Sequence, residues 1–297
     1  MSKPRTDRLG LSTDLPFAFE LFAPPNELVD LVNTYFSIRI ETETVDEIIP
    51  AYSAQMLLFP SGSAVLRPKG GTEYRTQTVC FSAPLLRATP VTFEGPARIL
   101  GASLTPLGWQ ALAHMPADKV NNRLLAGTEV LERTHAERLA ALAAEFEANA
   151  SEAAVFDAMS AILGERRASL NPKHARIVAK VTRWLADDLS PDIAKLYDEA
   201  DVSERTVQRV TRRFFGVSPF YLAKRYRAIR AAMMLANPQL SQEMRDALVD
   251  SYFDQAHMIR DIRRYTGRTP TKLGGGRIAH DTLAPQAHGE AARLLRE

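Results

Sequence analysis

The fold is decided by the stretch Ser203-Glu-Arg-Thr-Val-Gln-Arg-Val-Thr-Arg-Arg-Phe-Phe-Gly-Val-Ser-Pro219, which recurs 51 residues later as Asp254-Gln-Ala-His-Met-Ile-Arg-Asp-Ile-Arg-Arg-Tyr-Thr-Gly-Arg-Thr-Pro270. Each copy begins with a residue that caps helix N-termini, carries arginines at the same three positions and ends in Gly and then Pro. A capped start and a Gly-Pro end predict a helix of about three turns in each copy.

A shorter helix is predicted in front of each copy. Ser190 is the expected N-cap of a helix over Asp192–Ala200, and Ser241 that of a helix over Gln242–Asp250. A short helix, a tight turn and a second helix form a helix-turn-helix unit. Between the two units, Pro219–Ala236 is predicted to be one longer connecting helix.

This arrangement is suited to duplex DNA. One such helix fits the major groove, and successive groove segments on one face of B-DNA lie about 34 Å apart. Two helices on a rigid connector could read two successive segments. Arg205, Gln208, Arg209 and Arg212 are spaced to form one stripe along the first helix. The alternative is a helical bundle with an ordinary charged face.

The charge of the chain is unevenly divided. Its 297 residues include 37 Lys and Arg and 35 Asp and Glu. Residues 171–273 hold 19 basic and 12 acidic residues, a net charge of +7, which leaves 18 basic and 23 acidic residues, a net charge of −5, for the remainder. A basic C-terminal third favours a polyanionic partner.

Composition excludes several classes of protein. With 45% hydrophobic and 24% charged residues, the chain has a globular composition. No apolar run approaches the ~18 residues of a membrane span, and Met1–Gly10 lacks the apolar core of a secretory signal. The single cysteine, Cys80, excludes an internal disulfide framework and a multi-cysteine zinc module. A cytoplasmic protein without membrane contact is expected.

The N-terminal part has the pattern of a β-structure. Short apolar runs separated by turn residues predict a small sandwich or barrel, with strands at 54–59, 63–67, 76–81, 90–94 and 98–104. The helical spacing of Leu28, Leu31, Val32 and Tyr35 predicts a helix within residues 28–40. Helices are also predicted at 134–148 and 151–164, packing either on the sheet or on a second copy, before a polar break at 165–171.

Two signatures link the C-terminal part to a known family. Arg209–Pro219 and Arg260–Pro270 follow the pattern Arg-x-Phe-Arg-Arg-x-x-Gly-x-Ser-Pro, and Asp254-Gln-Ala-His is typical of the start of a second recognition helix. On these residues the chain resembles the DNA-binding domain of AraC-type transcription regulators (the AraC/XylS family) over about Lys173–Leu273. Two departures are Thr211, at a position usually taken by a core Phe, and Tyr252, where the second turn usually has Gly.

The resemblance implies an α+β architecture of two domains. Residues 15–165 would be a sensor or dimerisation domain, a small cupin-like β-barrel that ends in helices. Residues 172–273 would be an all-α domain with two helix-turn-helix units, followed by a flexible tail at 274–297.

The family's DNA contacts can be carried over position by position. Arginine pairs well with guanine and glutamine with adenine, whereas alanine offers only a methyl contact. The positions that read bases are then Arg205, Gln208, Arg209, Gln255, Ala256, His257 and Arg260. The positions expected to meet phosphates, or to remain solvated, are Thr206, Arg212, Arg213, Arg263 and Arg264. For Arg209 and Arg260, a structural role beside the long helix is the rival interpretation.

The expected sensor domain contains few residues that indicate a metal site, a nucleophile or a ligand. No histidine occurs between Leu15 and Leu104, so a cupin-type metal centre is not expected, and no cofactor is predicted. Cys80 lies in a strand pattern, which favours a buried apolar role over a nucleophile. Aromatic residues, among them Phe59, Phe81 and Trp109, could line a ligand pocket or form plain core.

The expected function is that of a non-enzymatic, sequence-specific transcription regulator. Its expected partners are double-stranded promoter DNA, RNA polymerase, a small-molecule effector and a second copy of the chain. The alternative is an interaction protein whose degenerate helix-turn-helix units bind another regulator. An enzyme with an appended DNA-binding module, such as a repair methyltransferase, is disfavoured because the chain has one cysteine.

Overall fold

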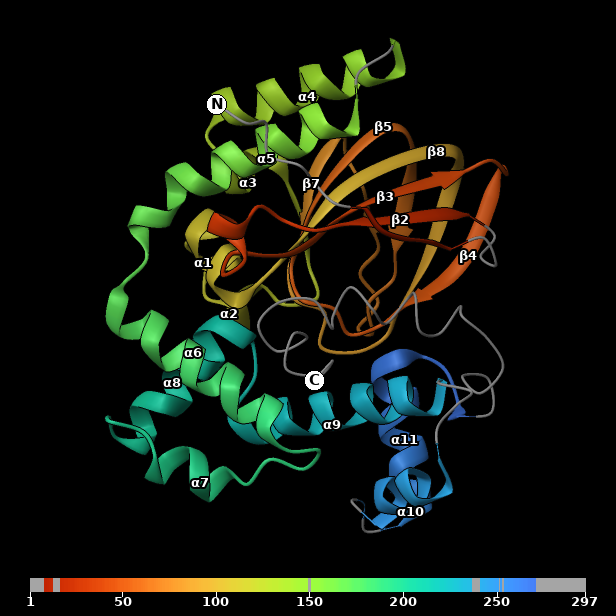
Figure 1. Cartoon of the computed structure of the whole chain (residues 1–297). Helices are drawn as coiled ribbons and strands as arrows, with labels where there is room; N and C mark the ends of the chain where they lie inside the picture. The colour runs from red at the N-terminus through yellow and green to blue at the C-terminus, as the bar shows by residue number, and fades with distance from the viewer. Residues whose placement is uncertain are drawn as a thin grey trace.

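A computed structural model of the chain describes residues 8–12, 17–148, 151–236, 241–250, 252 and 254–270 (Figure 1). An antiparallel sheet with covering helices is followed by a helical region. The strands are β1 (Arg8–Ser12), β2 (Ala18–Phe22), β3 (Val32–Ile40), β4 (Thr44–Ile49), β5 (Gln55–Leu66), β6 (Tyr74–Arg75), β7 (Val79–Ser82), β8 (Thr89–Leu104) and β9 (Leu124–Ala126).

The helices are more numerous after the sheet than within it. They are α1 (Pro106–Ala113), α2 (Ala117–Val120), α3 (Gly127–Val130), α4 (Arg133–Ala148), α5 (Glu152–Arg166), α6 (Pro172–Asp187), α7 (Ile193–Asp198), α8 (Glu204–Phe215), α9 (Pro219–Ala236), α10 (Gln242–Asp250) and α11 (Gln255–Thr266). Two short 3-10 helices are η1 (Asn26–Leu28) and η2 (Arg167–Ser169). No helix in the described part of the chain is long and apolar enough to cross a membrane.

The sheet follows the order β1-β2-β3-β8-β5-β7-β9, with β4 added to β8 and β6 to β5. The long strand β8 pairs with two strands along the same edge: its residues 97–104 pair with β3 and its residues 89–94 pair with β4. In the described residues β1 pairs only with β2 and β9 only with β7, so the path stays open. The expected cupin-like barrel is therefore wrong as a closed barrel, although an antiparallel N-terminal sheet is confirmed.

Two expected strand breaks are also wrong. Pro60-Ser61-Gly62 does not end a strand, because β5 continues to Leu66 with its register against β8 shifted on either side of Ser61. Gly62 has a φ of +69°, and a Cβ there would lie 2.4 Å from the Cβ of Ala97. The turn residues thus form bulges that bend one strand. The predicted strands 90–94 and 98–104 are likewise one strand, β8.

The helix expected within residues 28–40 is a strand, β3, preceded by η1. The helical spacing arose because β3 is buried on both faces. Leu31, Val32 and Tyr35 lie in the core under α4 and α5, whereas Phe36 and Ile40 lie in the core on the opposite face. A strand covered on both sides loses the polar–apolar alternation that identifies a half-buried strand.

The helices α4 and α5 cover one face of the sheet (Figure 1). Their apolar side chains, including Leu139, Phe156 and Met159, are buried within the chain, and the ring of Phe156 stacks on that of Tyr35 with centroids 4.9 Å apart. Of the two packing arrangements open from the sequence, packing on the sheet is the one observed. Cys80 is also buried, and burial raises the pKa of its thiol to about 12.

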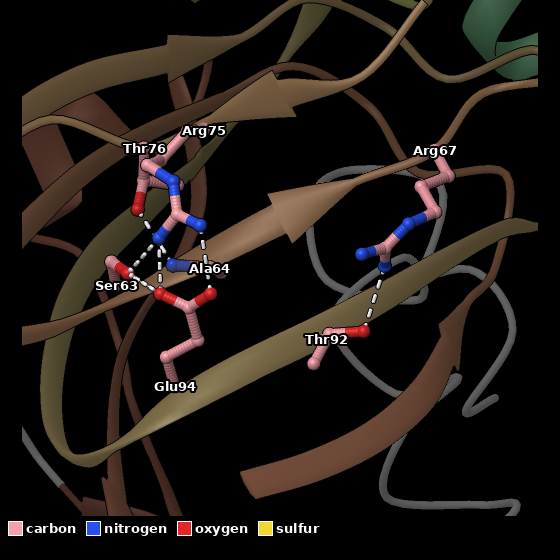
Figure 2. A network of polar contacts seen from close by, with 7 residues as sticks. All are labelled: Ser63, Ala64, Arg67, Arg75, Thr76, Thr92 and Glu94. Carbon is pink, nitrogen blue, oxygen red and sulfur yellow. Dashed lines mark hydrogen bonds and ion pairs between the residues drawn. The ribbon is translucent and has the colours of Figure 1, made fainter. Parts of the chain in front are cut away.

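A polar network joins three strands on the outside of the sheet (Figure 2). Arg75 of β6 forms a bidentate ion pair with Glu94 of β8, in which Nη2 donates to Oε1 at 2.8 Å. Ser63 of β5 donates its hydroxyl to the other carboxylate oxygen at 2.5 Å. The hydrogen bonds from Arg75 and Ser63 lower the pKa of Glu94 to about 2.

The helical region contacts the sheet through backbone and side-chain hydrogen bonds. The amide of Ala51 donates to the carbonyl of Tyr265 at 2.7 Å, and that of Ala88 to the carbonyl of Arg264 at 3.0 Å. The Nε of Arg213 in α8 donates to the Oε1 of Gln110 in α1 at 3.2 Å. The expected tail at 274–297 lies outside the described residues.

Candidate nucleic-acid interface

The first helix-turn-helix unit consists of α7 and α8. Asp192, not Ser190, caps α7, because its carboxylate accepts the amide of Ala194 at 2.9 Å. Ser203 caps α8 as predicted, accepting the amide of Thr206 at 3.4 Å. The helix ends at Gly216, whose φ of +82° places it in the left-handed region that glycine tolerates best.

The second unit repeats this construction with α10 and α11. Asp254 caps α11 as predicted, and its carboxylate accepts the amide of His257 at 2.6 Å and lies 2.9 Å from Nδ1 of the same residue. These hydrogen bonds lower the pKa of Asp254. The helix ends at Gly267, with a φ of +75°. The connector α9 has the bounds expected from the sequence and lies between the two units (Figure 1).

Equivalent positions of α8 and α11 are buried. Val207 and Thr211 of α8, and their equivalents Met258 and Ile262 of α11, are each less than 5% exposed. Phe214 and Tyr265, the aromatic residues of the repeat, are buried as well. These side chains pack into the cores of their units, α8 mainly on α6 and α7 and α11 on α9, so the opposite stripe of each helix faces solvent.

Both departures from the family pattern are accommodated within the units. Thr211 is fully buried, and its hydroxyl has no hydrogen-bond partner among the described residues. Tyr252 is buried, with 6% of its surface exposed. Its amide donates to the carbonyl of Val249 at 3.0 Å, and the guanidinium of Arg227 lies 4.4 Å from the centre of its ring.

The residues predicted to read bases lie along the solvent-facing stripes. In α8, Arg205 and Arg209 are exposed, while Gln208 is half-buried and donates to the hydroxyl of Tyr197 at 3.2 Å and to Glu204 at 3.0 Å. In α11, the exposed members of the set are Gln255, Ala256 and Arg260, and His257 is half-buried beside its cap.

The residues predicted to meet phosphates fall into two groups. Arg212 and Arg263 are exposed, and Thr206 is half-buried near the start of α8. Arg213 instead directs its side chain to Gln110 of the sheet domain, whereas Arg264 is half-buried and its backbone carbonyl accepts the amide of Ala88. In this conformation the last two arginines support the contact between the two parts of the chain.

One residue beside the interface was not predicted. Asp118 of α2 lies with Arg205, Gln208, Arg209 and Arg212 around one concavity on the surface of α8. It places a carboxylate next to the basic stripe. No pattern in the sequence indicates this, because α2 is brought to α8 only by the packing of the sheet domain on the helical region.

A family-model match supports the helix-turn-helix interpretation of this region. Residues 196–274 match the family model of a helix-turn-helix domain. A search of curated proteins found no match. Three similar solved structures are ToxT from Vibrio cholerae O395 (11% identity, 79% of this chain and 95% of that chain covered, TM-score 0.43), fatty-acid-bound ToxT from Vibrio cholerae strain SCE256 (11%, 78% and 95%, 0.42) and the AraC-like transcriptional activator CuxR (17%, 84% and 86%, 0.33). By its two capped helices, their arginines in register and this match, the region 196–274 is a helix-turn-helix domain of the AraC type.

Proposed function

We propose that this protein is a sequence-specific transcription regulator that binds double-stranded promoter DNA with α8 and α11. The observation that carries the proposal is the equivalence of the two helices. Arg209 and Arg260 occupy the same position in the repeat, and both are exposed, whereas the apolar positions Val207 and Met258 are both buried. A duplicated helix with a solvent-facing arginine stripe is suited to reading two groove segments.

The chemistry of the exposed stripes suits base recognition. Arg205, Arg209 and Arg260 could each donate two hydrogen bonds to a guanine, and Gln255 could pair with an adenine. Each such contact contributes about 1–3 kcal/mol of discrimination between bases. Arg212 and Arg263, one turn further along their helices, would neutralise phosphates and set the register on the duplex. The rival function, an interaction protein with degenerate units, rested on Thr211 and Tyr252, and both side chains are buried in the units.

The remaining parts of the proposal concern regulation. Residues 15–165 are proposed as the regulatory domain, residues 172–273 as the DNA-binding domain, and the protein as a homodimer in the cytoplasm that contacts RNA polymerase. A small-molecule effector is proposed to act through the contacts between the two domains, which include the pair Arg213 and Gln110. No catalytic activity is part of the proposal.

The proposal is tested by selecting bound fragments from genomic DNA with the full chain and measuring affinity by fluorescence anisotropy. The selected fragments should share a motif with two half-elements about one helical turn apart. The double variant Arg209→Ala, Arg260→Ala should lose about tenfold or more in affinity for that motif. Arg183→Ala, which removes an exposed arginine of α6, is the matched control and should bind normally. Unchanged affinity and site choice in the double variant would contradict the assignment of these helices.

A further inference from the structure

The helix α11 carries one large apolar side chain on the face that points to solvent. Ile259 is 36% exposed, whereas Met258 and Ile262 on the buried face of the same helix are 4% and 0% exposed. Among the described residues of α8 and α11, no other large apolar side chain is exposed. An exposed isoleucine in the middle of a polar stripe is therefore a specific feature of the second unit.

Ile259 lies among the residues assigned to the DNA interface. Gln255 and Ala256 precede it by four and three positions, Arg263 follows it by four, and all three are exposed. Side chains three or four positions apart on a helix are neighbours. Ile259 and Ala256 therefore form a small apolar patch between Gln255 and Arg263. The Nε of Arg260 donates to the carbonyl of Ala256 at 3.3 Å, which places this arginine at the edge of the patch.

The repeat assigns Ile259 to the same position as Gln208 of α8. In each copy this residue follows a buried apolar position and precedes the arginine that both copies share. Gln208 is half-buried and donates to the hydroxyl of Tyr197 at 3.2 Å and to Glu204 at 3.0 Å. The side chain of isoleucine has no polar atom and can form no such hydrogen bond. The two units thus present different chemistry at an equivalent position.

One group in the major groove of DNA suits an apolar side chain. Thymine presents its C5-methyl group there, whereas the edges of the other three bases present hydrogen-bonding groups. Removing one methyl group from water changes an equilibrium constant by about fourfold. An isoleucine in the exposed stripe of a recognition helix can therefore select thymine without forming a hydrogen bond.

We infer that Ile259, with Ala256 beside it, selects a thymine in the half-element bound by α11. This inference rests on the proposed function, because it requires α11 to enter the major groove. It makes the two half-elements different: α8 selects bases through polar side chains such as Arg205 and Arg209, and α11 adds an apolar contact. Two unequal helices fix the direction in which the chain lies on the duplex.

The test uses the full chain and the DNA motif recovered from genomic fragments. Each thymine of the motif is replaced in turn by deoxyuridine, which removes the C5-methyl group and leaves base pairing unchanged. At one or more positions the wild type should lose about fourfold in affinity, measured by fluorescence anisotropy. At that position Ile259→Ser should bind the thymine and uracil forms equally, and Ile259→Val should retain the difference.

The matched control is Val249→Ser. Val249 of α10 is 40% exposed and belongs to the same unit, but it lies outside the stripe of α11. This variant should respond to deoxyuridine as the wild type does. Thermal unfolding shows whether each variant is folded, and the response of the wild type to deoxyuridine requires no variant.

The outcomes distinguish this inference from the proposed function. If the wild type binds its motif specifically but every deoxyuridine form binds equally well, or the motif contains no thymine, the role of Ile259 is overturned and the proposed function stands. If Ile259→Ser keeps the full response to deoxyuridine at every position, another side chain contacts the methyl groups and the role of Ile259 is again overturned. If the wild type selects no motif, both fail.

Discussion

Arg268 and Glu47 form an ion pair that joins the end of the second helix-turn-helix unit to strand β4. Their Nη2 and Oε1 atoms are 2.7 Å apart, and the side chains are 14% and 20% exposed. The two residues are 221 positions apart in the sequence. The pair therefore fixes where α11 ends relative to the sheet, next to the hydrogen bond between Ala51 and Tyr265.

Glu47→Gln should destabilise the chain. The substitution leaves the Arg268 guanidinium mostly buried without a counter-charge, at an expected cost of about 1–3 kcal/mol in the free energy of unfolding. Chemical denaturation of the single variants and of Glu47→Gln, Arg268→Gln measures the coupling between the two side chains. The control is Glu41→Gln, which breaks the exposed pair with Arg39 and should change stability by less than about 0.5 kcal/mol. A coupling energy near zero would mean that this ion pair does not stabilise the contact between the second helix-turn-helix unit and β4.

Asp118→Asn should strengthen DNA binding. Asp118 borders the concavity formed by Arg205, Arg209 and Arg212, so its charge repels phosphates that approach this stripe. We expect affinity to rise about two- to fivefold at low ionic strength and the gain to shrink as salt is added, because salt screens exposed charges. Glu145→Gln, an exposed carboxylate on α4, is the control. No gain at low salt would show that α2 leaves α8 when DNA binds.

Thr211→Val should stabilise the first unit. The threonine hydroxyl is buried without a partner among the described residues, and valine has nearly the same shape without that group. We expect the free energy of unfolding to increase by about 1 kcal/mol, measured by urea denaturation. Val210→Thr, the reverse change at the neighbouring buried position, should destabilise. A loss of stability in Thr211→Val would reveal a hydrogen bond to that hydroxyl.

Glu94→Gln should alter the acid stability of the sheet. The pKa of Glu94 is lowered to about 2 in the folded chain, so its contribution is complete above its ordinary value of about 4.5 and disappears as the pH falls towards 2. The variant should unfold more readily than the wild type at pH 7, and the difference should vanish near pH 2. Thermal unfolding across this range is the measurement, and a difference that is constant with pH would contradict the role of the Arg75 pair.

Arg212→Ala should weaken binding equally on specific and random DNA. As a phosphate contact, Arg212 contributes to affinity without selecting sequence, and its loss should lower the slope of log affinity against log salt by about 1. Anisotropy titrations at several salt concentrations measure this slope. Arg183→Ala should leave it unchanged. If Arg212→Ala instead relaxes site choice, the side chain reads a base.

The C-terminal helices could be predicted because their signals are local. A cap such as Ser203 or Asp254, and a glycine such as Gly216 or Gly267, act on backbone groups within a few residues, so the bounds of α8 and α11 follow from the chain itself. The cap of α7 lies two residues after the predicted one, because both Ser190 and Asp192 can fill that position and Asp192 is the one hydrogen-bonded to α7.

The sheet was harder to predict because its signals are not local. Pro60-Ser61-Gly62 reads as a turn, yet pairing with β8 keeps the chain extended through it. Residues 28–40 read as a helix, yet β3 is covered on both faces by segments distant in the sequence. Strand pairing and two-sided burial depend on which segments meet, and a single sequence window does not contain that information.

By itself the sequence determined the duplicated capped helices and the register of their arginines, since spacing along a helix fixes which side chains share a stripe. Only the tertiary structure determined which arginine side chains are exposed, which contact the sheet domain and which face the cavity between the sheet domain and the helical region. Arg213 meets Gln110, 103 residues earlier in the chain, Asp118 lies beside Arg209, and Arg225 and Arg230 line that cavity. Exposure and charge pairing are set by packing between remote segments, and that packing is a property of the folded chain as a whole.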